Sequence, residues 1–161
     1  RAAPHMYCVN DGCVIDYQTG TGEEATAADN GTPDADHALA EARFLYEPNA
    51  SIMKAGCFGL IEQRFGVRQI APNSHLFTSF EPATGFPGRS FAVNAVCTMN
   101  KRELRRALAD VGKANIATRN FPMSVATLRS KLRLRDGGDV YLFATTSSSG
   151  THLLFRTSKQ A

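Results

Sequence analysis

The residues most suggestive of a cofactor site lie near the start of the chain. An apolar run that ends in an acid, Val14-Ile15-Asp16, is followed by the glycines of Gly20-Thr21-Gly22. Glycines between a strand and a helix let the backbone approach the phosphates of a bound nucleotide. Here Gln18 stands where the first glycine of such a turn would be, and Asn30-Gly31 and Pro33 interrupt any helix that follows. We therefore interpret the stretch as a loop and predict no cofactor-binding residue in this chain.

Histidine and cysteine, the usual residues of metal and nucleophilic sites, are too scattered to form one by spacing alone. They include no CxxC pair and no spacing typical of zinc. The sequence also contains no GxSxG, phosphate-loop or paired-carboxylate pattern. We predict no metal site and no catalytic residue, and we interpret the cysteines as free thiols of a cytoplasmic protein. The residues concerned are His5, His37, His75, His152, Cys8, Cys13, Cys57 and Cys97.

Basic residues carry the strongest functional signal, because they gather in one half of the chain. Residues 1–88 hold 5 Lys/Arg and 11 Asp/Glu, a net charge of −6, whereas residues 89–161 hold 13 Lys/Arg and 4 Asp/Glu, a net charge of +9. A basic half of this kind attracts polyanions such as nucleic acid. The alternative is a solvated basic face without a ligand, and charge alone does not choose between the two. The candidate nucleic-acid contacts are Arg102, Arg105 and Arg106 on one helix, Arg129 and Arg133 on one face of the next, and Lys113, Arg119 and Arg135 at the ends of elements.

One aromatic residue lies among these cations. Phe121, between Arg119 and Pro122, has a ring of the kind that stacks on a nucleobase. A buried phenylalanine that anchors the junction of a strand and a helix is the commoner role, and the sequence favours it.

Turn signals and apolar periodicity predict the elements of the first half. Asn10-Asp11-Gly12 between two β-rich runs is typical of a hairpin. Asn49 is a suitable cap for a helix that Gly66 would end, and the polar residues 18–38 predict a mobile loop. The predicted elements are strands at 6–9, 13–17, 43–46, 67–70 and 75–78 and a helix at about 50–65.

The second half has a clearer pattern. Asn100 and Glu103 open a helix predicted to run to about residue 111, and Ser124 opens another. With strands at 90–99, 115–119, 140–146 and 152–157, the order is β-α-β-α-β-β. The Pro/Gly-rich turn at 81–88 marks the boundary between a region 1–88 and a region 89–161.

These motifs, in their order, resemble a known family. The C-terminal half is similar to the THUMP-like C-terminal domain of bacterial class I S-adenosylmethionine (SAM)-dependent methyltransferases, and the segment before it resembles the ferredoxin-like segment of the Bacteroidetes branch. The residues that carry the resemblance are Lys113, Ile116, Arg119, Phe121-Pro122, Leu128-Arg129, Leu132, Leu134-Arg135, Gly137-Gly138, 141–146, and, upstream, 44–56 and 72–76.

The resemblance implies a fold and a role. The fold is α+β, with a ferredoxin-like N-terminal part packed on a β-α-β-α-β-β C-terminal part. The role is that of a non-catalytic module that docks RNA for a methyltransferase domain located upstream in the parent protein. The parent would use SAM as its cofactor, and this chain would not bind it.

Two alternatives stay open at this stage. The chain could be a structural module that packs on the methyltransferase domain or on a second copy without contacting nucleic acid. It could also be a self-contained enzyme for a small molecule, which would need a deep pocket with convergent polar groups. No apolar run approaches the roughly 18 residues that cross a bilayer, so we predict no membrane partner.

Overall fold

The computed structural model describes residues 5–10, 13–18 and 38–160 of the chain. The glycine motif at Gly20-Thr21-Gly22 lies outside these residues, as does the predicted loop 18–38 apart from its two end residues. Of residues 5–10 and 13–18 only the backbone is described.

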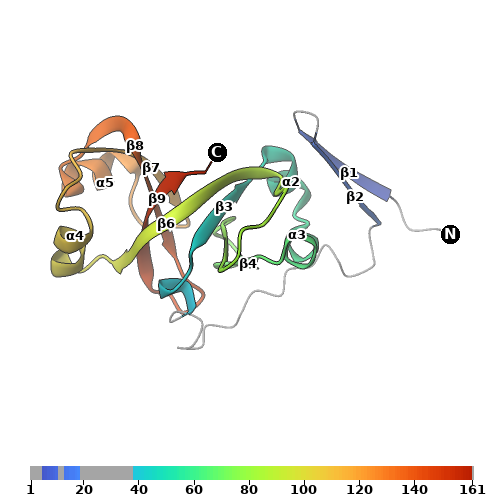
Figure 1. Ribbon diagram of the computed structural model, residues 1–161, viewed down its shortest axis with the longest axis horizontal. Coiled ribbons are helices and arrows are strands. Elements are labelled where there is room, and N and C mark those ends of the chain that lie inside the picture. Colours follow the sequence, from blue (N-terminus) through green and yellow to red (C-terminus); the bar gives the residue numbers. More distant parts are fainter. Residues whose placement is uncertain (1–4, 11–12, 19–37, 161) are drawn as a thin grey trace.

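A β-hairpin forms the first described part of the chain, as its turn signal predicts. Strand β1 (His5–Asn10) pairs antiparallel with β2 (Cys13–Gln18), with Val9 opposite Val14. The hairpin is separate from the main sheet, and β1 lies beside helix α2 (Ala50–Ala55) (Figure 1).

One seven-stranded sheet runs through the rest of the described chain. All neighbouring strands are antiparallel except β7 and β8, which are parallel and are therefore connected by a helical crossover and not by a tight turn. The pairing of β3 with β6 joins the two predicted parts edge to edge. In sheet order the strands are β4 (Arg68–Gln69), β5 (Phe77–Ser79), β3 (Phe44–Pro48), β6 (Gly88–Thr98), β9 (His152–Lys159), β8 (Arg135–Thr146) and β7 (Lys113–Arg119).

Two short helices replace the single helix predicted at 50–65. Helix α2 ends at Ala55, and α3 (Phe58–Phe65) begins after a break at Gly56. Gly56 takes a left-handed conformation (φ 68°), and its backbone N–H donates to the carbonyl of Ile52. A glycine adopts this conformation without the steric cost of a Cβ atom, so it ends α2. The predicted stop at Gly66 is confirmed by a second left-handed glycine (φ 64°).

Both helices of the second half begin at their predicted caps. The Asn100 side chain accepts from the backbone N–H of Arg102 at 2.9 Å and opens α4 (Lys101–Ala107). The Ser124 side chain accepts from the N–H of Thr127 at 3.1 Å and opens α5 (Val125–Leu132). Helix α4 stops short of the predicted residue 111.

The junction of β7 with β8 contains a bulge that the sequence pattern did not predict. Ala114 lies opposite Asp136, but Asn115 lies opposite Tyr141, so residues 137–140 are looped out of the ladder. The Asn115 side-chain amide closes this loop by donating to the carbonyl of Gly138 at 2.8 Å. As a result β8 begins at Arg135 and not at residue 140.

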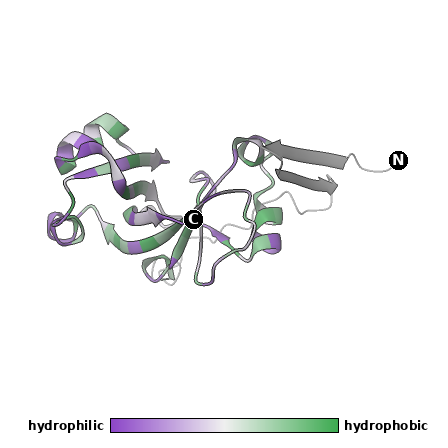
Figure 2. Ribbon diagram, turned by 45° about the horizontal axis from the view of Figure 1, so that its top comes forward, coloured by the Kyte–Doolittle hydropathy of each residue, from purple (hydrophilic) through white to green (hydrophobic). Residues whose placement is uncertain are grey.

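Apolar side chains form three clusters on the two faces of the sheet. Figure 2 shows hydrophobic residues distributed along its strands and helices. On one face, α2 and α3 cover β3 at one end, and α4 and α5 cover β6 to β9 at the other. The opposite face carries the third cluster, which includes Leu45 of β3, Phe91 of β6, Phe143 of β8 and Phe155 of β9. This cluster spans both parts, so they share one core.

Candidate nucleic-acid interface

Helix α4 presents cations to solvent because its apolar side is fixed to the sheet. Leu104 is buried in the cluster beneath α4 and α5, and this orients the opposite face outward. Arg102, Arg105 and Arg106 are all exposed, as their spacing predicts. Lys101, which the sequence analysis did not single out, is exposed beside them.

Strand pairing brings two further predicted residues together. Lys113 and Arg135 are register partners at the start of β7 and β8, although 21 residues separate them in the chain. The backbone N–H of Arg135 donates to the carbonyl of Gly112 at 3.1 Å, and the aliphatic part of Lys113 lies against Gly138. Both side chains are exposed at the end of the molecule that α4 and α5 form.

The predicted pairing of Arg129 and Arg133 on one helix face is wrong. Helix α5 ends at Leu132, and Arg133 follows it in a left-handed conformation (φ 56°) that turns the chain. Arg133 is exposed. Arg129 instead reaches inward: its Nη1 donates to the carbonyl of Ala114 at 3.0 Å, and its Nη2 lies 3.2 Å from Asp136.

Arg119 also has partners within the protein. Its Nη2 lies 2.8 Å from Oε2 of Glu47, whose other oxygen accepts from Nε of Arg89 at 2.9 Å. Glu47 is a buried residue on β3, and β6, β9 and β8 lie between β3 and β7 in the sheet. The contact therefore requires the sheet to curl until the end of β7 approaches β3. Arg119 thus links the two parts through an ion pair, and its guanidinium is not free to bind a ligand in the way an unpaired arginine is.

Arg156 of β9 is a basic residue that the sequence analysis missed. It donates to both carboxylate oxygens of Asp110, at 2.8 and 3.0 Å, and to the carbonyl of Ala107 at the end of α4. Its hydrogen bonds hold the pKa of Asp110 below the usual value for an aspartate. These contacts tie the residues after Ala107 to the sheet and explain why α4 is shorter than predicted.

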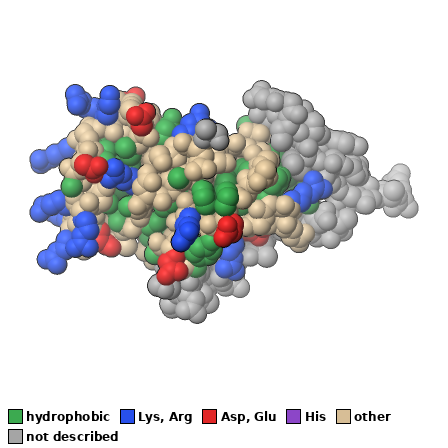
Figure 3. Space-filling model, in the orientation of Figure 1, with side chains coloured by type: hydrophobic (Ala, Val, Ile, Leu, Met, Phe, Trp, Pro, Cys, Tyr) green, Lys and Arg blue, Asp and Glu red, His purple; other side chains and the backbone are tan. Residues whose placement is uncertain are grey.

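Eight exposed cations on or beside α4, α5 and the start of β7 and β8 define a surface that we call the basic end. Within the described part of the chain, none of its members forms a salt bridge. Figure 3 shows Lys and Arg side chains gathered at this end of the molecule. The basic end comprises Lys101, Arg102, Arg105, Arg106, Lys113, Lys131, Arg133 and Arg135.

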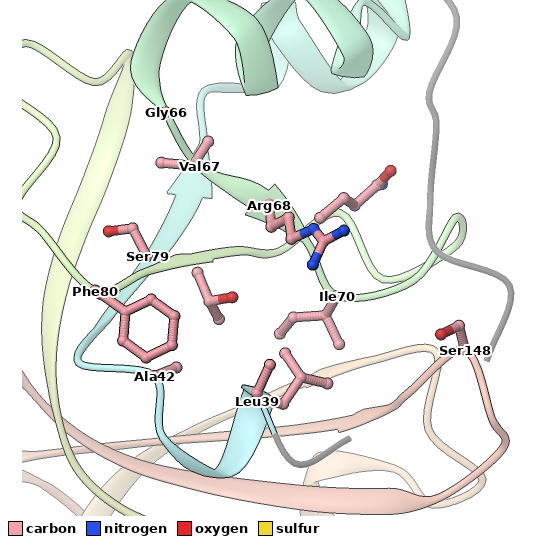
Figure 4. Close-up of a pocket in the computed structure, with 12 residues that line it drawn as sticks. Leu39, Ala42, Gly66, Val67, Arg68, Ile70, Ser79, Phe80 and Ser148 are labelled. Carbon is pink, nitrogen blue, oxygen red and sulfur yellow. The ribbon is translucent and has the colours of Figure 1, made fainter. Parts of the chain in front are cut away.

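A hollow lined by residues of β4, β5 and the turn between β8 and β9 bears on the enzyme alternative. It has a volume of about 180 Å³ and lies beside Phe80, whose side chain is 51% exposed. Figure 4 shows Phe80, Leu39 and Ile70 around it. Its twelve lining residues include no Asp, Glu, His or Cys. The hollow therefore offers an apolar contact and no acid-base pair.

Three further features bear on metal binding, membrane insertion and thiol chemistry. In residues 5–10, 13–18 and 38–160 no group of three or more His, Cys, Asp or Glu side chains is placed to hold a metal ion. Among the helices that the structure describes, none has the length and apolar character to cross a bilayer. The pKa of the buried Cys97 thiol is raised to about 11, first by burial and then by the nearby Glu103 carboxylate, so this thiol is a poor nucleophile at neutral pH.

Comparison with known families defines the class of the protein. Residues 44–87 match the family model of a ferredoxin-like domain, and residues 88–159 match that of a THUMP-like domain. Over residues 44–159 the chain therefore belongs to these two domain families, in this order. The resemblance inferred from the sequence and the predicted α+β fold are confirmed.

A solved structure extends the likeness to nearly the whole chain. A candidate methyltransferase from Porphyromonas gingivalis W83 is similar over 98% of this chain, with 28% sequence identity and a TM-score of 0.81. The present chain spans 38% of that chain. No curated protein matches the sequence. The THUMP-like domain and the likeness to this neighbour indicate an accessory module.

Proposed function

We propose that the chain is a non-catalytic module that docks RNA for a methyltransferase domain in a longer protein. The observation that carries the proposal is the basic end, where eight exposed cations from α4, α5 and the start of β7 and β8 lie together. A surface of this kind binds the phosphate backbone through charge and releases counterions on binding.

Of the four acids in this half of the chain, two are paired within the protein, and eight exposed cations outnumber the other two, Glu103 and Asp139. Asp110 and Asp136 already pair with Arg156 and Arg129. Glu103 accepts a hydrogen bond from the hydroxyl of Thr98 at the start of α4. The cations of the basic end are therefore available to an external anion, whereas Arg119 and Arg129 contribute mainly by fixing the frame around it.

A second candidate function is a structural module that packs on the methyltransferase domain or on a second copy. The observation that favours it is the apolar hollow beside the exposed Phe80. The two functions use surfaces that share no residue, so they are separable by experiment.

In this proposal the longer protein uses SAM as its cofactor, and its methyltransferase domain, not this chain, holds it. A nucleoside cofactor is held by an acid that accepts from its ribose hydroxyls, and the apolar hollow has no Asp or Glu in its lining. We therefore derive no methyl-transfer step for this chain.

The test is a fluorescence-anisotropy titration of a blunt RNA hairpin at several salt concentrations. The double variant Arg102→Gln/Arg105→Gln removes two exposed cations of α4. If each arginine neutralises one phosphate, the slope of log K against log salt should fall by about 0.7–0.9 for each of them, or about 1.6 for the pair. Because both side chains are exposed, the unfolding free energy should change by no more than about 0.5 kcal/mol.

The matched control is Lys54→Gln, which removes an exposed cation from α2 at the other end of the molecule. We expect its slope to equal that of the wild type. An unchanged slope in the folded double variant would remove α4 from the interface. Absence of binding at low salt would contradict the RNA function and favour the structural module.

A further inference from the structure

A hollow with an aromatic and a histidine side chain lies at the C-terminal end of β7, the end opposite to Lys113. It has a volume of about 500 Å³, within the range of small-molecule sites. The Phe121 ring is partly buried beneath α5 and meets the His152 ring edge-on, with centroids 5.5 Å apart and an interplanar angle of 73°. The lining residues are Thr118, Asn120, Phe121, Pro122, Thr146 and His152.

Two linked hydrogen bonds determine which ring nitrogen of His152 carries the proton when the imidazole is neutral. The Thr146 hydroxyl has one proton, and it donates that proton to the backbone carbonyl of Asn120 at 2.7 Å, because a carbonyl can only accept. At its 3.1 Å contact with Nδ1 of His152 the hydroxyl must therefore accept. Nδ1 carries the ring proton, and Nε2 is left as a hydrogen-bond acceptor.

Asn120 lines the same hollow in a left-handed conformation (φ 53°), which asparagine tolerates better than most residues. The bond from Thr146 fixes its backbone. Within the described part of the chain, its side-chain amide has no hydrogen-bond partner. The hollow thus combines an aromatic surface, an acceptor on His152 and an amide that both donates and accepts.

We propose that this hollow binds one unpaired nucleobase of the docked RNA, and that it favours a base with an exocyclic amino group (adenine, cytosine or guanine) over uracil. This inference rests on the proposed function. The amino group would donate to Nε2 of His152 while the base stacks on an aromatic ring. Uracil fits less well, because its only ring N–H lies between two carbonyl oxygens that face the Nε2 lone pair.

The length of β7 gives the distance between an RNA helix bound at Lys113 and a base bound in the hollow. Lys113 is the member of the basic end that begins β7, and Arg119 precedes the hollow. Seven residues of a strand at about 3.3 Å each place Lys113 about 20 Å from the hollow. A stacked strand advances about 3.4 Å per nucleotide. A single-stranded tail of about six nucleotides would therefore connect a hairpin on the basic end with the hollow.

The experiment compares three RNA hairpins in anisotropy titrations: blunt, with a six-adenosine tail, and with a six-uridine tail. We expect the adenosine tail to tighten binding at least about fivefold over the blunt hairpin, the lower limit for stacking one base. The uridine tail should add less. The variant His152→Phe keeps a ring but removes the acceptor. Both tails should then tighten its binding over the blunt hairpin, and by equal factors.

Phe80→Leu changes an exposed aromatic residue outside the hollow, and it is the matched control. It should leave the effect of both tails unchanged. Phe121 is partly buried, so its substitution could unfold the protein, and the exposed His152 is substituted instead. A thermal melt checks that the His152→Phe variant is folded. If the blunt hairpin binds but neither tail tightens binding, the hollow is not a base site and the proposed function stands. If no hairpin binds at all, both inferences are overturned.

Discussion

At the scale of single residues, Glu47 connects segments that are distant in both sequence and sheet order. Its carboxylate is buried, yet it accepts from Arg89 on the neighbouring strand β6 and from Arg119 at the end of β7. Burying a carboxylate is unfavourable unless hydrogen bonds and opposite charges compensate it. Here two guanidinium groups do so, while their own side chains remain 46% and 32% exposed.

Glu47→Gln should therefore destabilise the protein. The amide keeps the shape of the side chain but loses the charge that both arginines face. We expect the unfolding free energy to fall by about 1.5–3 kcal/mol, the range for hydrogen bonds to charged groups. Urea denaturation measures it. Glu81→Gln, which changes an exposed acid, is the control and should stay within about 0.5 kcal/mol of the wild type. Equal stabilities of the two variants would show that the Glu47 contacts contribute nothing.

The residues of the basic end could be predicted in part from the sequence. The exposure of Arg102, Arg105 and Arg106 follows from helical spacing, because Leu104 identifies the buried side of α4. The internal contacts of Arg119 and Arg129 could not be predicted, since Glu47 and Ala114 come close to them only when the sheet is assembled. Spacing gives the side of an element on which a residue lies, but not its partner across the fold.

At the scale of elements, β6 joins the two parts because Gly88 lets it approach β3. A Cβ atom on Gly88 would overlap the carbonyl oxygen of Glu47 and would lie 2.8 Å from Cα of Pro48. These are backbone atoms, which cannot move without disturbing the β3–β6 ladder. The absence of a side chain at this position is therefore a condition for the pairing.

Gly88→Ala should destabilise the protein by more than about 3 kcal/mol through this backbone clash. Gly85→Ala is a matched control in the preceding turn: Gly85 has φ 74° but nothing within 4 Å of the added atom, so only conformational strain of about 1 kcal/mol is expected. Thermal unfolding of both variants tests the difference. If the Gly88→Ala protein were as stable as the Gly85→Ala protein, the pairing of β3 with β6 would not depend on the missing side chain at residue 88.

Most elements could be predicted from caps and periodicity, and the exceptions have local causes. The apolar pattern of 50–65 is continuous, and Cys57, Leu60 and Ile61 are buried as it predicts. The break at Gly56 leaves no mark in that pattern, because a glycine inside a helix is tolerated as well. The bulge in β8 depends on Asn115 of β7, which lies 23 residues before the carbonyl of Gly138 that it binds.

At the scale of the whole molecule, the two domain families share one sheet and one core. The matched ranges meet at residues 87 and 88, yet β3 and β6 pair across that point. Leu45 and Phe91 pack in the same cluster from the two sides. The sequence boundary is thus not a boundary in the hydrophobic core.

A fragment of residues 88–160 should therefore fail to fold like the full chain. It would expose the edge of β6 and the apolar face that Leu45, Ile70 and Leu76 cover. We expect a poorly dispersed ¹H–¹⁵N spectrum or aggregation on size exclusion, with the full chain as the control. A well-dispersed spectrum that overlays that of the same residues in the full chain would show that the second part is autonomous.

The place of β9 in the sheet has a consequence for synthesis. This strand is the last of the chain described, but it lies in the sheet between β6 and β8 and pairs with both. A ribosome adds residues one at a time, and no earlier strand can fill that position. The sheet therefore stays incomplete between β6 and β8 until residues 152–159 have left the exit tunnel. Until then one edge of β6 has no hydrogen-bonded neighbour strand. The nascent chain is most exposed to misassembly, and most in need of a chaperone, during that interval.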